Sequence, residues 1–275
     1  CKNKIMTTLV LNSPAKINIY LKILKRRSDG YHELESAFQL INLYDEIEVS
    51  STKSKEIKIE CNPDIIKLEE NIIFKAVQLI KNKYKVKQGI YIKLKKEIPI
   101  GAGLGGGSSN AASILLALNN LWKLEISQKD LLKLGKDLGA DVPFFLNGKN
   151  AYVSGIGDKL KEKKSDGSKY ILIYPNIIAS TKKVFEFYSN NKKFIEENNL
   201  QNSLLKPLLG MYPEIKSFYN KNISSFDIKL TGSGSTMFIS YKDEGELKKI
   251  MEIIPINWRF FLAEAIQYSP LRGMS

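Results

Sequence analysis

The chain has 275 residues, of which 43% are hydrophobic and 10% aromatic. This composition excludes a disordered chain, and the length suits one large domain or two of ordinary size. The formal net charge of +13 raises the question of a nucleic-acid partner. The lysines are interleaved with glutamate and asparagine, however, and no cluster of arginine and aromatic residues forms a base-reading surface. We therefore expect no nucleic-acid partner.

The sequence carries no signal for a membrane or an oxidising compartment. No apolar run approaches the roughly 20 residues that span a bilayer, and no charged-then-apolar signal segment opens the chain. The two cysteines, Cys1 and Cys61, lack the spacing of a disulfide framework or a metal site. We therefore expect no membrane partner and a reducing, cytoplasmic location.

The first predicted element is a strand over residues 9–24. Ile17 and Leu21 belong to an apolar face, and the opposite face carries Lys16 and Asn18. The side chains of Lys16 and Asn18 are therefore expected on the same side of the strand. From the residues alone, a solvated lysine on a half-exposed strand is the better explanation of Lys16.

A turn at Asp29-Gly30 follows this strand and places Tyr31 and His32 on a loop just beyond it. His32 is the only histidine in the sequence. No serine lies in a nucleophile-elbow context, which argues against a hydrolase that uses a serine and this histidine. A single loop histidine otherwise indicates no function.

The next segment alternates in a strand pattern and then becomes helical. Residues 47–61 predict a hairpin, because two alternating strands flank a turn of serine, threonine and lysine. Asn71 predicts the N-cap of a helix that runs to Tyr84, and another strand covers residues 90–94.

The most distinctive stretch contains five glycines in the seven positions from Gly101 to Gly107, directly before a helical pattern. Glycines let consecutive backbone N–H groups converge, and the first turn of a helix adds positive potential, so this loop suits a polyphosphate. A flexible linker is the alternative, but a linker would not lead directly into a long amphipathic helix. The predicted phosphate-binding residues are Pro99, Ile100, Gly101, Ala102, Gly103, Leu104, Gly105, Gly106, Gly107, Ser108 and Ser109.

Two common phosphate-binding fingerprints do not fit this loop. The glycine spacing from Gly101 to Gly106 satisfies the dinucleotide pattern, yet residues 95–99 interrupt the apolar strand that should precede it. The P-loop spacing fails because no lysine follows Gly107.

An aspartate follows the next helix, which Ser127 caps and Gly139 closes. Asp141 stands between this helix and the apolar run at residues 142–146. A carboxylate near a core is costly unless something pairs with it or uses it. A turn-forming aspartate and a functional one explain this position equally well.

A polar segment at residues 161–168 predicts the boundary between a domain of residues 1–160 and a domain of residues 161–275. The second half alternates short strands with helices, as in a small α+β layer. Ser180 predicts the N-cap of one of these helices, whose apolar residues are Val184, Phe185 and Tyr188. The loop of this half at residues 231–236 holds more glycines and hydroxyls than a turn needs, which indicates close backbone approach.

The segment from Pro99 to Ala112 reads P-x-x-x-G-L-G-G-G-S-S-N-A-A and resembles the phosphate loop of the GHMP kinases. Its triple glycine is most similar to the branch that phosphorylates a cytidine diphosphate-linked methylerythritol. Residues 13–18, 29–32 and 230–238 also resemble this branch, in the same order. The resemblance covers the chain from Ser13 to roughly Leu271.

This resemblance implies residue roles. It makes Asp141 the base that takes a proton from the acceptor hydroxyl, while Lys16 orients this hydroxyl and offsets phosphoryl charge. Tyr31 would stack on cytosine and His32 would hydrogen-bond to it. The implied substrate-binding residues are Asn18, Tyr31, His32 and Thr181.

The resemblance also implies an α+β fold of two domains. The first would be similar to ribosomal protein S5 domain 2, the second would be ferredoxin-like, and the active site would lie in the cleft between them. The reaction would transfer the γ-phosphoryl group of ATP, with Mg²⁺, to the 2-hydroxyl of the substrate, in the non-mevalonate isoprenoid route. We assign no protein ligand to Mg²⁺, because the loop contains no acidic residue. We expect a monomer or a weak homodimer.

Two alternatives stay open. Another small-molecule kinase of the superfamily would keep the glycine loop and Asp141 but would not need the Asp-Gly-Tyr-His segment at residues 29–32. A non-enzymatic nucleotide or nucleic-acid binder would keep the basic charge, but it would need neither Asp141 nor Lys16.

Overall fold

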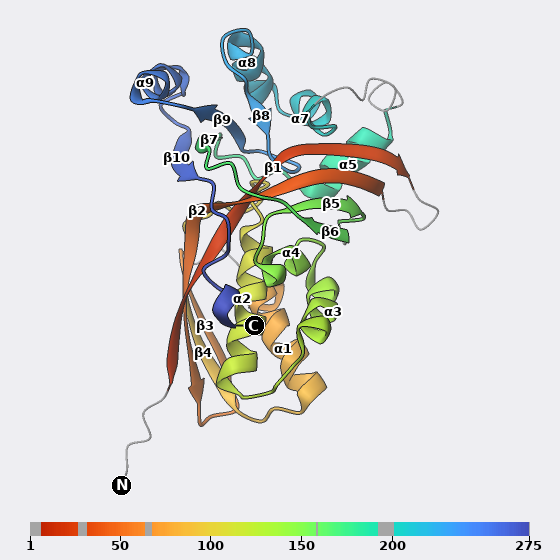
Figure 1. The fold of residues 1–275 in the computed structure, drawn as a ribbon, viewed down its shortest axis with the longest axis vertical. Helices are drawn as coiled ribbons and strands as arrows, with labels where there is room; N and C mark the ends of the chain where they lie inside the picture. Colours follow the sequence, from red (N-terminus) through yellow and green to blue (C-terminus); the bar gives the residue numbers. More distant parts are fainter. Residues whose placement is uncertain (1–6, 27–31, 64–67, 158, 192–200, 275) are drawn as a thin grey trace.

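A computed structural model describes residues 7–26, 32–63, 68–157, 159–191 and 201–274. Tyr31, one of the predicted base-binding residues, lies outside the described residues. The described chain forms two sheets with helices packed on them, and the smaller sheet is at the top of Figure 1. The predicted α+β class is confirmed. No described helix combines the length and the apolar character needed to cross a membrane.

The elements fall into two halves along the chain. The first half contains β1 (Thr8–Arg26), β2 (His32–Thr52), β3 (Ile57–Asn62), η1 (Leu68–Glu70), α1 (Ile72–Tyr84), β4 (Gly89–Lys95), α2 (Gly106–Leu121), α3 (Gln128–Leu138), α4 (Val142–Asn147), β5 (Ala151–Gly155) and β6 (Lys159–Glu162). The second half contains β7 (Lys169–Tyr174), α5 (Thr181–Ser189), α7 (Leu205–Met211), α8 (Pro213–Asn222), β8 (Lys229–Leu230), β9 (Met237–Tyr241), α9 (Glu244–Ile253), β10 (Arg259–Glu264) and η2 (Arg272–Met274).

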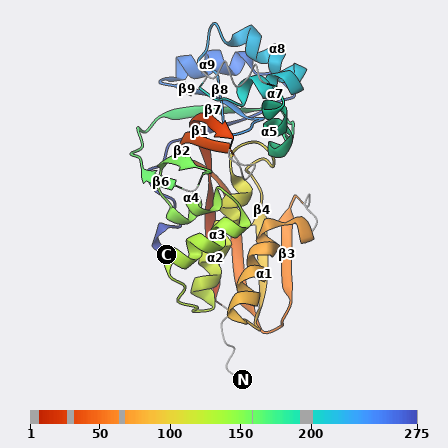
Figure 2. The same cartoon turned by 90° about the vertical axis from the view of Figure 1, so that its right-hand side faces the viewer.

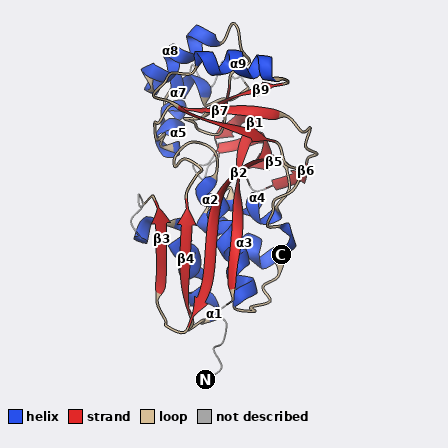
Figure 3. Cartoon of the chain, turned by 90° about the vertical axis from the view of Figure 1, so that its left-hand side faces the viewer, coloured by secondary structure: helices blue, strands red, loops and turns tan. Residues whose placement is uncertain are grey.

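β2 is the central strand of the larger sheet. The strand order is β3-β4-β2-β5-β6, and β1 pairs with β2 outside this path. One end of β2, residues 46–52, pairs with β4, and the other end, residues 34–38, pairs with β5. Helices α1, α2 and α3 cover one face of the sheet, in front of the strands in Figure 2 and behind them in Figure 3. Their buried side chains form a first core with Ile47, Val49 and Ile92.

The predicted hairpin over residues 47–61 is wrong. β3 pairs in parallel with β4 and does not pair with β2. β2 has no free edge over residues 46–50, because β1 occupies one side and β4 the other. The chain after Thr52 therefore passes β4 and joins the sheet on its far side.

The helices begin at the capping residues that the sequence predicts. The side chains of Asn71, Ser127 and Ser180 each accept a hydrogen bond from a backbone N–H in the first turn of α1, α3 and α5. These N–H groups have no partner within the helix, so a side-chain acceptor fixes where each helix starts.

The smaller sheet is antiparallel and has the order β10-β7-β9-β8. On one face, Ile171 and Ile173 of β7 pack with side chains of α5, α7, α8 and α9 in a second core. On the other face, Leu172 packs with Ile17 of β1 and Ile41 of β2. The smaller sheet therefore lies between its own helices and the long ribbon of β1 and β2.

The last described residues return to the first half of the chain. The N–H of Ser269 donates to the carbonyl oxygen of Gly148 at 2.9 Å, and Leu271 is buried in the first core. The division into residues 1–160 and 161–275 stays a prediction, and the end of the second segment packs on the first.

Candidate active site

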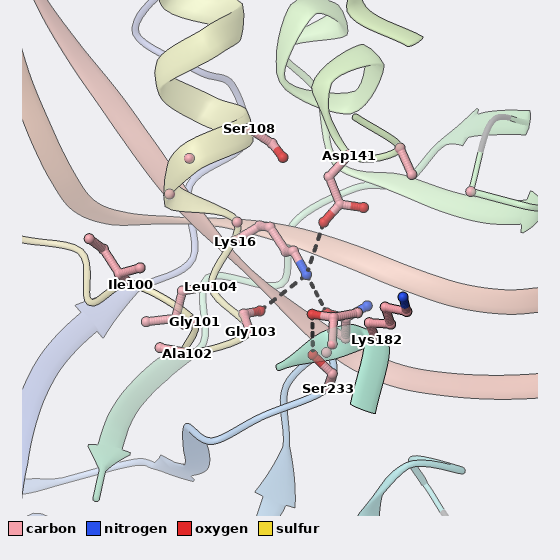
Figure 4. A pocket seen from close by; sticks show the side chains of 18 of the residues that line it. Lys16, Ile100, Gly101, Ala102, Gly103, Leu104, Ser108, Asp141, Lys182 and Ser233 are labelled. Carbon is pink, nitrogen blue, oxygen red and sulfur yellow. Dashed lines mark hydrogen bonds and ion pairs between the residues drawn. The ribbon is translucent and has the colours of Figure 1, made fainter. Parts of the chain in front are cut away.

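A cavity of about 930 Å³ opens between the two halves. Its walls come from β1, the start of β2, the glycine loop, the first turn of α2, the start of α4 and α5. Figure 4 shows side chains from both halves projecting into it. The predicted site residues that line the cavity are Lys16, Asn18, His32, Pro99, Ile100, Gly101, Ala102, Gly103, Leu104, Gly105, Gly106, Gly107, Ser108, Asp141 and Thr181. Ser109 is fully buried and does not line it.

The glycine loop needs glycine for its conformation and for space. Gly103 and Gly105 have φ angles of +78° and +72°, which residues with a Cβ rarely adopt. A Cβ on Gly103 would lie 2.2 Å from the carbonyl oxygen of Thr231, and one on Gly105 would lie 2.9 Å from the Phe145 ring. The loop leads into α2 at Gly106, where the N–H groups of the first turn carry positive potential into the cavity.

Lys16 is buried, which contradicts its explanation as a solvated surface residue. Its Nζ donates to Oδ1 of Asn18 at 2.6 Å and to the carbonyl oxygen of Gly103 at 3.2 Å. The same atom lies 3.5 Å from Oδ2 of Asp141 and 4.8 Å from the centre of the Phe38 ring. Burial lowers the pKa of Lys16, and the carboxylate of Asp141 acts in the opposite direction. The dashed lines in Figure 4 show how three acceptors converge on this ammonium group.

Asp141 stands directly before α4 and faces Lys16 (Figure 4). A turn-forming aspartate would hydrogen-bond to a nearby backbone N–H, but this side chain makes no capping hydrogen bond at the start of α4. The side chain is 30% exposed, compared with 4% for Lys16. The carboxylate can therefore contact both the buried ammonium group and a molecule in the cavity.

The amide of Asn18 has a fixed orientation. Its Nδ2 donates to Oγ of Ser36 at 2.9 Å, and Oγ of Ser36 donates to the carbonyl oxygen of Tyr20 at 2.5 Å. Because the single hydroxyl proton of Ser36 is used on Tyr20, this oxygen accepts from the amide nitrogen. The amide oxygen of Asn18 is thereby turned toward Lys16. Thr231 adds a contact from the second half, since its Oγ1 accepts from the N–H of Asn18 at 3.0 Å.

His32 lies at the start of β2 and packs against α5. Its Nε2 is 3.1 Å from Oγ of Ser189. The centre of its ring lies 5.6 Å from that of Phe185 and 6.0 Å from that of Tyr188. Thr181 begins the same helix, so α5 brings a hydroxyl, an aromatic ring and the partner of the histidine to one wall of the cavity.

Sequence reasoning missed Phe185 and Ser189, which both line the cavity. The spacing of Val184, Phe185 and Tyr188 predicts an apolar helix face, and Val184 and Tyr188 are indeed buried in the second core. No local signal connects this helix to His32, because more than 150 residues separate His32 from Ser189. Only the packing of α5 against the start of β2 brings them together.

Sequence reasoning also missed a buried ion pair beside the glycine loop. Nζ of Lys96 lies 2.7 Å from Oδ2 of Asp45, and Oδ1 of Asp45 accepts from the N–H groups of Glu97 and Ile98 at 2.8 Å each. Burial lowers the pKa of Lys96, and Asp45 opposes this shift. This pair fixes the turn that leads into Pro99. The interruption of the apolar strand by charged residues was its only sequence signal.

The described residues hold no group of three or more histidine, cysteine, aspartate or glutamate side chains that could bind a metal ion by themselves. Ser108 and Asp141 project toward the same part of the cavity (Figure 4). These two oxygen donors suit a hard cation that arrives with most of its ligands already in place.

The chain is similar to known kinases over nearly its whole length. Residues 71–149 match the family model described as GHMP kinases N terminal domain. A 4-diphosphocytidyl-2-C-methyl-D-erythritol kinase from Pseudoalteromonas translucida is 36% identical over 271 residues, which cover 96% of this chain and 95% of the relative. The crystal structure of a 4-(cytidine 5'-diphospho)-2C-methyl-D-erythritol kinase has a TM-score of 0.79 and 29% identity, covering 94% of this chain and 99% of that chain. The mevalonate kinase of Methanococcus jannaschii has the same fold, with a TM-score of 0.70 and 16% identity over 95% of this chain and 99% of that chain.

We predict that Gly103→Ala separates the glycine loop from the loop at Thr231. The new Cβ would meet the carbonyl oxygen of Thr231 in a backbone conformation that alanine rarely adopts. The free energy of unfolding, measured with urea, should fall by about 1–3 kcal/mol or more.

Gly107→Ala is the matched control. The nearest atom to its added Cβ is Cγ2 of Ile72 at 3.8 Å, so the free energy of unfolding should stay unchanged or rise slightly. Equal losses for the two variants would contradict the close approach at Gly103.

Proposed function

The chain belongs to the family of 4-diphosphocytidyl-2-C-methyl-D-erythritol kinases, and we propose that it transfers the γ-phosphoryl group of ATP to the 2-hydroxyl of 4-diphosphocytidyl-2-C-methyl-D-erythritol. One observation carries the residue assignment: Lys16 and Asp141 meet beside Gly103 of the glycine loop, inside the cavity. A cation and a carboxylate beside the glycine loop support this assignment, because phosphoryl transfer brings a negatively charged phosphoryl group to a hydroxyl that must lose its proton.

Asp141 acts as the base in this proposal. Its partly exposed carboxylate can accept the proton of the acceptor hydroxyl as the bond to phosphorus forms. Lys16 hydrogen-bonds to the reacting oxygens and offsets the negative charge that gathers on the phosphoryl group. Asn18 keeps the ammonium group of Lys16 in place through the bond at 2.6 Å. Phosphoryl transfer consists mainly of positioning and charge neutralisation, which this arrangement supplies.

The glycine loop and the start of α2 bind the phosphates of ATP in this proposal. The converging N–H groups replace the lysine of a P-loop as the source of positive potential. When bound, Mg²⁺ would neutralise negative charge on the phosphates. Ser108 and Asp141 would complete its ligand shell, and the nucleotide and water would supply the remaining ligands.

The cytidine end of the substrate lies along α5 in this proposal. Phe185 offers an aromatic face beside His32, and Ser189 holds the imidazole from the end of the same helix. Thr181 lies about 12 Å along the helix from Ser189, at 1.5 Å per residue, so the helix can contact a nucleotide from its base to its phosphates. Stacking of the Tyr31 ring on cytosine, as a second aromatic contact, stays a prediction.

We further propose that the enzyme acts on a small molecule in the cytoplasm, without a nucleic-acid partner, as a monomer or weak homodimer. Its two domains would be residues 1–160 and 161–275.

A panel of acceptors tests the proposed reaction. Purified protein with ATP and Mg²⁺ should form ADP with 4-diphosphocytidyl-2-C-methyl-D-erythritol and not with mevalonate or homoserine. Phosphorus NMR of the product should show a new phosphate ester at the 2-hydroxyl. Turnover of mevalonate or homoserine in place of the cytidine conjugate would assign another acceptor to the site.

Asp141→Asn should lower kcat by about 10²–10⁴-fold, because the amide keeps the shape of the carboxylate but cannot take the proton. The affinity for ATP in the absence of Mg²⁺, measured by calorimetry, should stay the same. Asp137→Asn is the control: this carboxylate lies on the exposed side of α3, outside the cavity, and its loss should leave kcat unchanged. A folded Asp141→Asn protein with undiminished kcat would remove the base assignment.

The pH dependence of kcat/KM should report the charge of Lys16. Burial places its pKa below the ordinary value of 10.5, so kcat/KM should fall as pH rises through this lowered pKa and the ammonium group loses its proton. Lys16→Arg should show no such fall in its residual activity, because a guanidinium group keeps its proton in this range. An unchanged alkaline fall in Lys16→Arg would assign the titration to another group.

A further inference from the structure

We propose that Ser189 is a positioning residue that fixes the tautomer of His32 and thereby the preference of the site for cytosine over uracil. The identity of the base rests on the proposed function. The hydrogen-bond argument for the tautomer does not depend on it.

Ser189 makes two hydrogen bonds with one hydroxyl proton. Its Oγ donates to the carbonyl oxygen of Phe185, one helical turn earlier, at 2.9 Å. The same Oγ lies 3.1 Å from Nε2 of His32. Since the proton is used on the carbonyl, Oγ accepts at its second contact, and Nε2 must carry the donated proton.

The position of the imidazole ring is set by the same helix. The Phe185 ring lies 5.6 Å from it at 37°, and the Tyr188 ring meets it nearly edge-on at 6.0 Å. Tyr188 is 2% exposed and belongs to the second core, so it provides a rigid support. These two rings therefore hold the plane and the centre of the imidazole ring. Figure 1 shows α5 beside the end of β1 and the start of β2.

The tautomer decides which base the histidine accepts. A neutral imidazole with its proton on Nε2 has an acceptor lone pair on Nδ1. Any group that hydrogen-bonds to Nδ1 must then be a donor. The 4-amino group of cytosine is a donor, whereas the 4-oxo group of uracil is an acceptor. With the proton on Nδ1 this preference would be reversed.

The single histidine of the chain makes the tautomer directly measurable. In protein labelled with ¹⁵N-histidine, long-range proton–nitrogen correlations identify which ring nitrogen carries the proton. At a pH where the ring is neutral, the parent protein should show the Nε2–H tautomer. Ser189→Ala should show a mixture of tautomers, and Ser189→Thr, which keeps the hydroxyl, should restore the parent spectrum.

Two outcomes of this measurement would overturn the proposal. One is an Nδ1–H tautomer in the parent protein, which would mean that Ser189 donates to the ring. The other is the same tautomer ratio in the parent protein and in Ser189→Ala. Ser217→Ala, a change at an exposed position on α8, controls for general effects of losing a hydroxyl and should leave the spectrum unchanged.

Nucleotide binding tests the consequence for base selection. Cytidine 5'-diphosphate and uridine 5'-diphosphate are titrated into each variant by calorimetry. The parent protein should prefer the cytidine nucleotide, and Ser189→Ala should lose roughly 5- to 150-fold of this preference while ATP affinity stays the same. Ser189→Thr should recover it. An unchanged preference in Ser189→Ala would overturn the role of Ser189 in base selection.

The two readouts separate this inference from the proposed function. If neither pyrimidine nucleotide binds the parent protein, the proposed function fails and the base-selection part fails with it. The histidine spectrum still decides whether Ser189 sets the tautomer. If cytidine 5'-diphosphate binds with preference but the tautomer does not respond to Ser189, the function survives and the inference is wrong.

Discussion

The burial of the Lys16 ammonium group is the constraint on which the rest of the site depends. A buried charge without partners is too costly to persist, so acceptors must be provided around it. Here they come from three separate segments: the side chain of Asn18 on the same strand, the carbonyl oxygen of Gly103 in the glycine loop and the carboxylate of Asp141 before α4. The strand, the loop and the short helix must each be placed correctly for the lysine to remain charged.

The same constraint ties the two halves together. The carbonyl oxygen of Gly103 accepts from Lys16 and also from Oγ1 of Thr231, which belongs to the second half. At the other end of the cavity, His32 of β2 meets Ser189 of α5, again across the halves. Both the proposed phosphate end and the proposed base end of the cavity therefore depend on how the smaller sheet packs against the ribbon of β1 and β2. A change in this packing should affect ATP and acceptor binding together.

Local signals made much of this structure predictable from the sequence. Capping at Asn71, Ser127 and Ser180 and the density of glycine before α2 depend on neighbouring residues, so a sequence contains them. The pairing of strands and the covering of a strand face depend instead on residues far away in the sequence. The hairpin prediction failed because β1 and β4 already occupy both edges of β2. Periodicity assigned Lys16 to the polar face of its strand, but it could not reveal that this face is covered too.

A comparison of the two buried lysines shows why one ion pair suits the proposed catalysis and the other suits a structural role. Lys96 and Asp45 are 2.7 Å apart, both are almost inaccessible, and Asp45 uses its second oxygen on two backbone N–H groups. Because this carboxylate is fully buried, a substrate cannot reach it. Asp141 lies farther from its lysine, at 3.5 Å, remains 30% exposed and makes no capping hydrogen bond. A base must be able to exchange partners during the reaction, so the looser pair suits catalysis and the tighter pair holds the turn before the glycine loop.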